Sequence, residues 1–251
     1  MSSQSLSPAV NSAADVLDLL AEVGEPLSGS EIARRIGRAK STVSNIVAAL
    51  EQTGLVERSD NTYRLGRKLV ELAGAYLTQT DLVAEFHRIC RSLPVAKDET
   101  LSLSSFHGDA ILYLAHHNGS QPVRWFANVG ARLPIVDTAM GVAMLSTYTE
   151  DELAEFFDSV TEYAAPTPNA YRSEDEVRAA IQQARIDGYA VGDQLNTLGL
   201  CSLARPVRSR FDNRKLAVGV TMLSARRDAD LESALLADLQ VLAESLPPAT
   251  D

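Results

Sequence analysis

The chain has 251 residues, with 23 Lys and Arg against 33 Asp and Glu, and a formal net charge of −10. Hydrophobic residues make up 45% and charged residues 22%, which is typical of a globular protein with one or two domains. The 2 cysteines lie far apart and form no Cys-x-x-Cys motif, which argues against a disulfide scaffold and a zinc knuckle. No apolar run approaches the roughly 18 residues of a membrane-spanning helix, and residues 1–12 lack the pattern of a secretory signal. We therefore expect a cytoplasmic protein with no membrane partner.

The negative charge is unevenly distributed along the chain. Residues 1–70 carry equal numbers of acidic and basic side chains, so residues 71–251 hold the whole deficit. Within residues 30–68 the charge is +4, because 8 Lys and Arg stand against 4 Asp and Glu. DNA is bound through cationic contacts to phosphate. The acidic net charge therefore does not exclude DNA as a partner, because this short basic segment could supply those contacts.

Three helices are predicted before residue 54. Apolar residues at helical spacing over residues 13–23 predict the first helix. Ser28 and Glu31 have the spacing of a capping box, which predicts the start of a second, short helix. The apolar stripe of a third helix is formed by Val43, Ile46, Val47 and Leu50.

Two short extended runs follow, over residues 55–58 and 63–65, and four polar residues between them predict a hairpin. Three helices and a hairpin are the plan of a winged helix-turn-helix, whose third helix enters the major groove of DNA. The outward positions of that helix are short polar residues plus one cation, which suits contact with bases and phosphates. The candidate DNA-binding residues are Arg38, Lys40, Ser41, Thr42, Ser44 and Asn45, with Arg58 and Arg64 at the hairpin. The alternative is a protein-interaction module whose polar helix face is merely solvated.

Residues 66–93 form a helical linker in this interpretation. One apolar stripe runs over residues 69–77 and a second over residues 82–93, with a break near residues 78–81. Such a linker is a natural dimerisation element. The alternative, that its stripe packs on the domains of the same chain, stays open.

From Thr100 the apolar period changes to two, which predicts strands. Expected strands lie at residues 101–106, 110–117, 123–127, 189–192, 202–207 and 217–223, with Gly108-Asp109 and Asn118-Gly119 as turns. Expected helices lie at residues 138–147, 150–158, 173–187 and 228–246, and Ser173 with Glu176 has the form of another capping box. This order predicts an α+β domain built on an antiparallel sheet.

Catalytic and cofactor motifs are absent from the sequence, including the nucleophile elbow, the dinucleotide fingerprint and the phosphate-binding loop. His116 and His117 are neighbours on a predicted strand, so they point to opposite faces and would not share a metal ion. Cys201 has no evident base to activate it. We expect neither a metal nor a cofactor, and we favour a protein that is not an enzyme over a hydrolase or other enzyme that uses the α+β domain.

The chain as a whole resembles bacterial regulators of the isocitrate lyase regulator (IclR) family. In the N-terminal part the resemblance rests on residues 12–20, 27–37, 40–58 and 63–69, with K-S-T-V-S-N-I-V-A-A-L at residues 40–50. In the C-terminal part it rests on A-R-L-P-I-V-D-T-A-M-G-V-A-M-L at residues 131–145, on residues 150–153, on D-G-Y-A-V-G-D at residues 187–193, on L-G-L-C-S-L-A-R-P-V at residues 198–207 and on residues 217–221.

The resemblance implies a transcription factor, a repressor in our interpretation, that binds a double-stranded DNA operator and responds to a small-molecule effector. It implies a winged helix-turn-helix over residues 1–66, linker helices over residues 67–94 and a GAF-like effector domain over residues 95–251. Members of the family usually form homodimers and often homotetramers. Their effectors are typically carboxylic or aromatic acids of a catabolic pathway.

The effector pocket of the family can be carried over position by position. Val142 stands where the family usually has Lys, Met140 is bulkier than usual, and Gly192-Asp193 replaces an acidic pair. The effector-binding residues that this comparison implies are Trp125, Leu133, Ala139, Met140, Asp193, Leu200, Ser202, Gly219 and Thr221. Fewer polar anchors and one Trp favour an aromatic or larger ligand over a very small keto acid. Alternatively, Trp125, Leu133 and Leu200 are ordinary core residues.

Overall fold

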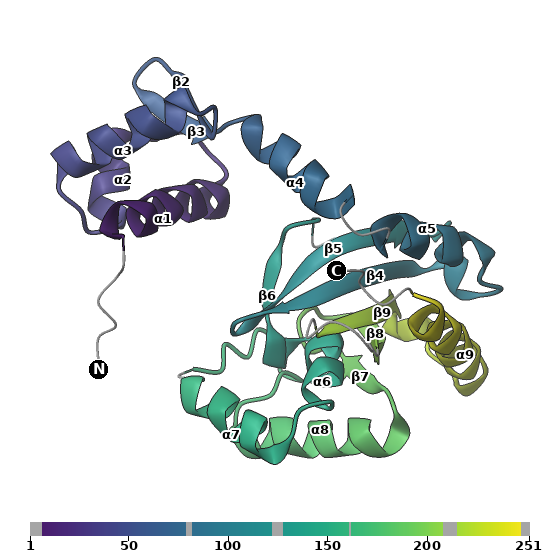
Figure 1. Ribbon diagram of the computed structural model, residues 1–251. Helices are drawn as coiled ribbons and strands as arrows, with labels where there is room; N and C mark the ends of the chain where they lie inside the picture. The colour runs from purple at the N-terminus through teal and green to yellow at the C-terminus, as the bar shows by residue number, and fades with distance from the viewer. Residues whose placement is uncertain (1–6, 79–81, 122–127, 161, 208–214, 247–251) are drawn as a thin grey trace. The chain divides into compact units, whose positions relative to one another are not determined.

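Contacts within the chain divide it into two compact units, an N-terminal unit of residues 1–79 and a C-terminal unit of residues 80–251. The structure is a computed structural model, and it describes residues 7–78, 82–121, 128–160, 162–207 and 215–246 (Figure 1). No helix in these ranges is both long enough and apolar enough to cross a membrane.

The N-terminal unit consists of helices packed beside a small sheet. Its helices are α1 (Pro8–Val23), α2 (Gly29–Arg35), α3 (Lys40–Gln52) and α4 (Lys68–Thr78), and its strands are β1 (Leu27–Ser28), β2 (Val56–Ser59) and β3 (Thr62–Leu65). The strands are ordered β1-β3-β2, and β2 and β3 form the predicted hairpin. Val16, Ile32, Val43 and Val47 are almost fully buried, so the predicted apolar stripes of the first three helices form one core. This arrangement confirms the helix-turn-helix and the hairpin beside it.

Local capping explains where two of these helices start and stop. Ser28 and Glu31 form the predicted capping box, in which each side chain accepts a backbone N–H of the other residue. Gly24 ends α1 in the left-handed region, with φ of 70°, which glycine adopts at little cost. Strand β1 was not predicted, because two residues carry no periodic signal and their pairing with β3 is tertiary.

The two linker helices differ in burial. The structure ends α4 at Thr78 and begins α5 (Leu82–Ser92) at Leu82, on either side of the predicted break. The apolar stripe of α5 is buried in its own unit, with Phe86 and Ile89 almost inaccessible to solvent. In contrast, Val70, Leu72 and Tyr76 on α4 are largely exposed. The alternative that the linker stripe packs within the same chain therefore holds for α5. It does not hold for the exposed residues of α4 within the described part of the chain.

The C-terminal unit is built on an antiparallel six-stranded sheet with the order β6-β5-β4-β9-β8-β7. Its strands are β4 (Thr100–His107), β5 (Ala110–Asn118), β6 (Arg132–Pro134), β7 (Ala190–Asp193), β8 (Leu200–Val207) and β9 (Leu216–Leu223). Its other helices are α6 (Ala139–Leu145), α7 (Glu150–Ser159), α8 (Glu174–Asp187) and α9 (Ala229–Ser245), with short 3-10 turns at Ala96–Asp98, Ile135–Asp137 and Ser224–Arg226. The α+β class is confirmed.

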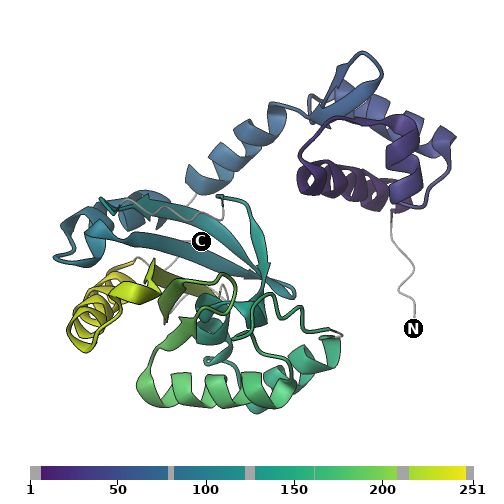
Figure 2. The same cartoon turned by 180° about the vertical axis from the view of Figure 1, so that it is seen from behind.

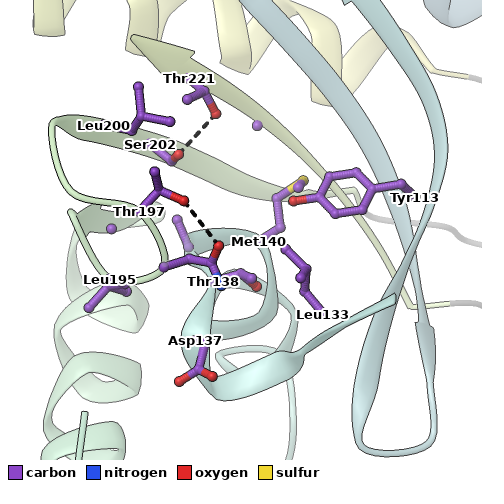
Figure 3. Close-up of a pocket in the computed structure, with 14 residues that line it drawn as sticks. Tyr113, Leu133, Asp137, Thr138, Met140, Leu195, Thr197, Leu200, Ser202 and Thr221 are labelled. Carbon is purple, nitrogen blue, oxygen red and sulfur yellow. Dashed lines mark hydrogen bonds between the residues drawn. The ribbon is translucent and has the colours of Figure 1, made fainter. Parts of the chain in front are cut away.

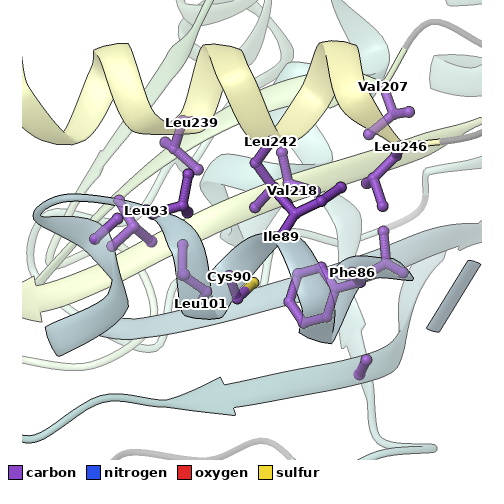
Figure 4. Packing of buried hydrophobic residues seen from close by; sticks show 14 of the residues in the cluster. Phe86, Ile89, Cys90, Leu93, Leu101, Val207, Val218, Leu239, Leu242 and Leu246 are labelled. Carbon is purple, nitrogen blue, oxygen red and sulfur yellow. The ribbon is translucent and has the colours of Figure 1, made fainter. Parts of the chain in front are cut away.

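Helices cover both faces of this sheet. Alternate residues of β9 show the division, since Val218 and Val220 pack with α5 and α9 whereas Ala217 packs with α6 and α8. Figure 4 shows the first of these layers, in which Phe86 and Ile89 of α5 share a cluster with Leu239 and Leu242 of α9. From behind, in Figure 2, α8 lies on the far side of the sheet from α9.

Both cysteines belong to this unit and are fully buried as free thiols. Burial raises the pKa of Cys90 to about 12 and that of Cys201 to about 11. Neither thiol is therefore appreciably ionised near neutral pH, and Cys201 is poorly suited to act as a nucleophile.

One capping prediction is wrong in part. The Ser173 hydroxyl accepts the N–H of Glu176, but the Glu176 carboxylate accepts the N–H of Arg172 and not that of Ser173, so the box is half formed. A complete box that was not predicted stands at Thr149 and Glu152, where it starts α7. The expected strand at residues 123–127 lies outside the described residues, so the hairpin expected at Asn118-Gly119 stays a prediction, and β5 ends at Asn118.

Candidate DNA-binding surface and ligand pocket

One side of α3 is open to solvent along its first two turns. Val43, Ile46 and Val47 are buried against α1 and α2, because they recur at helical spacing. This packing leaves the intervening side chains exposed. The exposed positions are Lys40, Ser41, Thr42, Ser44 and Asn45.

None of these five side chains makes a hydrogen bond or ion pair within the described part of the chain. Ala39, the residue before α3, provides no side-chain cap, so the first backbone N–H groups of the helix have no side-chain acceptor. The start of α3 therefore combines a free cation, free hydroxyl groups and free amide donors. This is the chemistry that phosphate and base edges require.

The basic residues flanking α3 are not free in the same way. Arg38, in the turn before α3, lies 3.8 Å from the Asp15 carboxylate of α1. Arg58 in β2 donates through Nε to the Asp60 carbonyl oxygen, and its guanidinium stands 5.8 Å from the centre of the Tyr63 ring. These contacts orient both guanidinium groups but leave other N–H groups available.

Arg64 shares an acidic partner with a residue that was not predicted. Glu57 of β2 accepts from Arg64 Nη2 at 2.9 Å and from Arg67 Nε at 3.0 Å. The sequence motif Y-R-L-G-R contains both arginines, but their shared partner shows only in the structure, where hairpin register places Arg64 opposite Glu57 and Arg67 reaches the same carboxylate from the turn after β3.

The C-terminal unit contains a pocket between the sheet and α6, drawn in Figure 3. Its volume is about 480 Å³, including the space open to solvent at its mouth. The lining residues come from β5, β6, the 3-10 turn before α6, the start of α6, β7 and the loop after it, and strands β8 and β9. They are Tyr113, Leu133, Asp137, Thr138, Ala139, Met140, Gly192, Leu195, Asn196, Thr197, Leu200, Ser202, Gly219 and Thr221.

Neutral polar groups stand on the sheet side of this pocket. Ser202 Oγ and Thr221 Oγ1 lie 2.9 Å apart, because the two residues are directly opposite on neighbouring strands (Figure 3). On the other side, Thr197 Oγ1 donates to Asn196 Oδ1 at 3.3 Å. No Lys, Arg or His occurs among the described lining residues.

Met140 sets how far the pocket extends toward the sheet. The Ser104 hydroxyl donates to Met140 Sδ at 3.3 Å, and Figure 3 shows the thioether beside Tyr113. A Cβ added at Gly219 would stand 3.0 Å from Met140 Cγ, so glycine provides the room for this side chain. Methionine is unbranched and adaptable, which allows the pocket wall to adjust to a ligand.

Asp137 is an unusual member of the lining. Its side chain is 1% exposed, and its Oδ1 atom has no hydrogen-bond partner among the described residues. Burial raises the pKa of this carboxyl group above its ordinary value.

The structure brings seven of the nine implied effector residues to this pocket, which are Leu133, Ala139, Met140, Leu200, Ser202, Gly219 and Thr221. Asp193 lies outside the lining. Gly192 takes that place, since neighbours on a strand face opposite ways, and the Asp193 carboxylate instead lies 3.9 Å from Arg227. Trp125 lies outside the described residues. Sequence reasoning missed Tyr113 and the loop residues Leu195, Asn196 and Thr197, which carry no local motif.

Two family models match the chain, one in its N-terminal part and one in its C-terminal part. The family model described as the IclR helix-turn-helix domain matches residues 9–60, and the model described as the bacterial transcriptional regulator IclR C-terminal domain matches residues 74–247. An HTH-type transcriptional regulator of Mycobacterium tuberculosis is 31% identical over 230 residues, which is 90% of this chain and 87% of that protein.

Solved structures share the fold. An IclR transcriptional regulator from Alicyclobacillus acidocaldarius superposes with a TM-score of 0.84 at 23% identity, over 96% of this chain and 98% of that one. An IclR homologue from Microbacterium hydrocarbonoxydans, solved as a complex with 4-hydroxybenzoate, gives a TM-score of 0.77 at 19% identity, over 95% of this chain and 98% of that one.

Proposed function

The chain belongs to the IclR family of bacterial transcriptional regulators, with a helix-turn-helix DNA-binding domain and a C-terminal effector domain, and from this premise we propose that it is a repressor. It binds an operator in double-stranded DNA, in the cytoplasm, and a small-molecule effector changes its affinity for that operator. Repression needs only that the bound protein occupy the DNA. The protein acts without catalysis, cofactor or metal.

The exposed side of α3 is the observation that supports DNA binding. Lys40, Ser41 and Thr42 stand at the start of the helix without partners in the described chain, and Ser44 and Asn45 continue the same side. In this proposal α3 lies in the major groove, where its hydroxyl and amide groups meet base edges and Lys40 meets phosphate. Arg38, Arg58 and Arg64 contact the flanking backbone.

The pocket supports the effector part of the proposal. We propose a carboxylic or aromatic acid, and the Microbacterium homologue bound to 4-hydroxybenzoate supports an aromatic one. Since no cationic side chain lines the described pocket, neutral donors such as the hydroxyl groups of Ser202 and Thr221 would receive the acid group. Leu133, Met140 and Leu200 provide apolar contact with the rest of the ligand.

We further propose a homodimer that assembles into a homotetramer. The linker between residues 67 and 94 would transmit effector binding to the paired DNA-binding domains over residues 1–66. Such coupling requires that the effector bind two states of the protein with unequal affinity.

The test is binding to the DNA upstream of the protein's own gene. Lys40→Ala should lower the apparent affinity several-fold and make the salt dependence shallower by about 0.9 in log–log slope, because one phosphate contact is lost. Ser41→Ala should weaken binding to the operator more than to unrelated DNA, since its contact is part of sequence readout. A Lys40→Ala protein with unchanged affinity and unchanged slope would contradict the placement of α3 in the groove.

The same gel shift separates the proposal from the protein-interaction alternative, in which no duplex is retarded. An enzyme would need a nucleophile, a base and an acid in one place. The buried Cys201 thiol is not such a nucleophile.

A further inference from the structure

Two arginines, Arg64 on the β2–β3 hairpin and Arg67 in the turn after it, bind one carboxylate. Glu57 accepts from Arg64 through Oε2, at 2.9 Å from Nη2 and 3.3 Å from Nε, and from Arg67 through Oε1 at 3.0 Å. Both carboxylate oxygens are therefore engaged by guanidinium groups. Two ion pairs share one acidic side chain.

Backbone register creates this cluster. Glu57 and Arg64 are directly opposite on the paired strands β2 and β3, so their side chains leave the hairpin on the same face. Arg67 follows at the turn into α4, where the N–H of Lys68 donates to the Gly54 carbonyl oxygen and holds the chain beside the hairpin. All three side chains belong to the N-terminal unit.

The arginines are open to solvent while the carboxylate is covered by them. The side chains of Arg64 and Arg67 are 62% and 93% exposed, whereas that of Glu57 is 27% exposed. Each guanidinium has more N–H groups than Glu57 engages, so each still presents donors outward. Hydrogen bonds from Arg64 and then Arg67 lower the pKa of Glu57, so this carboxylate is ionised at neutral pH.

A DNA phosphate offers the same chemistry as the Glu57 carboxylate, an anion with two oxygens that a guanidinium can engage bidentately. Any phosphate that reaches Arg64 or Arg67 also meets the negative charge beneath them. The Lys40 ammonium on α3 has no such competitor in the described chain. The hairpin therefore differs from α3 in carrying its own counter-anion.

We propose that Arg64 on the hairpin and Arg67 in the turn after it form a sequence-independent phosphate site, and that Glu57 competes with DNA for it and so limits non-specific binding. This inference rests on the proposed function. It adds Arg67 to the residues proposed to contact DNA. It also gives Glu57 the role of weakening non-specific binding.

Binding to a labelled duplex of mixed sequence tests the inference, because phosphate contacts do not depend on sequence. Full-length protein is titrated by fluorescence anisotropy over a range of salt concentrations. Glu57→Gln should tighten binding by about threefold to tenfold at moderate salt and steepen the log–log salt slope by up to about 1, as the freed arginines neutralise phosphate.

A double-mutant cycle with Arg67→Gln separates competition from a simple change of net charge. The increase in DNA affinity caused by Glu57→Gln should be markedly smaller in a protein that already carries Arg67→Gln. It should vanish in a protein that carries Arg64→Gln as well. The matched control is Glu51→Gln, which removes the same charge from an exposed position on α3 that has no ion partner among the described residues. It should change affinity much less than Glu57→Gln.

The outcomes are distinct. Unchanged or weaker binding by a folded Glu57→Gln protein, or the same gain without the two arginines, would overturn the inference while leaving the proposed function intact. A wild-type protein that binds no duplex at any salt concentration would overturn the proposed function, and this inference with it. Circular dichroism shows whether each variant is folded, and the highly exposed Arg67 provides a variant that is expected to fold in any case.

Discussion

Ser202 and Thr221 form a cross-strand pair of hydroxyl groups at 2.9 Å on the wall of the pocket. Each hydroxyl can both donate and accept, so the pair can turn to meet a ligand oxygen without any change in backbone. Replacing one partner by an apolar group of similar shape removes that contact with little change in packing.

Ser202→Ala and Thr221→Val should therefore each weaken effector binding by about threefold to tenfold, the usual net value of one hydrogen bond. The ligand for calorimetry is the carboxylic or aromatic acid that most raises the melting temperature in a thermal-shift screen. Operator affinity without the effector should stay unchanged. If both variants titrate as the wild type does, the proposed polar anchor is refuted.

Asp137 makes stability depend on pH. Its folded-state pKa is raised by burial, so the folded protein holds this proton more tightly than the unfolded chain does. The stabilising effect is present below the unfolded pKa and is lost as the pH rises through the folded pKa. Asp137→Asn should thus raise the free energy of unfolding by about 1 kcal/mol at neutral pH and by less under acidic conditions. Urea denaturation at acidic and neutral pH checks this, and a difference independent of pH would count against it.

The pocket illustrates which residues a sequence can identify. Leu133, Ser202 and Thr221 could be assigned because they lie in stretches that resemble the family. Tyr113 could not, since it sits in an ordinary apolar strand and reaches the pocket only through the curvature and pairing of β5. Asp193 was expected at the pocket, but it is absent from the lining, because alternation along β7 turns Gly192 toward it.

Short elements of this fold depend on side-chain caps and on tertiary pairing. The seven residues of α2 are too few to be stable alone, and its first free N–H groups are satisfied through the Ser28–Glu31 box. Strands β1 and β6, of two and three residues, exist because β3 and β5 pair with them. Long amphipathic helices such as α3 could be predicted from spacing, whereas elements fixed by distant partners could not.

Ser28→Ala should destabilise the N-terminal unit by about 1 kcal/mol, the typical cost of losing an N-cap. Because α2 precedes the turn into α3, operator affinity should fall as well. Ser30→Ala is the control, since Ser30 is exposed on the same helix and forms no capping hydrogen bond. Equal loss of stability in the two variants, measured by chemical denaturation, would mean that the cap contributes nothing specific.

At the scale of the whole molecule, charge and apolar surface are divided between regions. The excess of acidic residues lies after residue 70, and the segment with +4 charge contains α3 and the hairpin. In the proposed function, an acidic C-terminal unit repels DNA and contact falls to the segment with +4 charge. The exposed apolar residues of α4 form the other conspicuous region, because about half or more of the surface of Val70, Leu72 and Tyr76 is open to solvent.

Leu72→Glu should weaken the proposed homodimer by at least about tenfold, since it places a charge in an apolar interface. Light scattering with size-exclusion chromatography should then show monomer at concentrations where the wild type is dimeric. Ile186→Glu is the matched control, because Ile186 is also an exposed branched apolar residue, on α8, and dimers should persist in it. A Leu72→Glu protein of unchanged mass would exclude α4 from the interface.

The buried thiols of Cys90 and Cys201 have a practical consequence for following the two units in solution. With pKa values raised to about 12 and about 11, neither sulfur reacts readily with maleimide dyes near neutral pH. Cysteines introduced at exposed Ser30 and Gln182 would then be the labelled ones, with the native residues left in place. Energy transfer between the two dyes would report the spacing of the units with and without effector, in an otherwise natural chain.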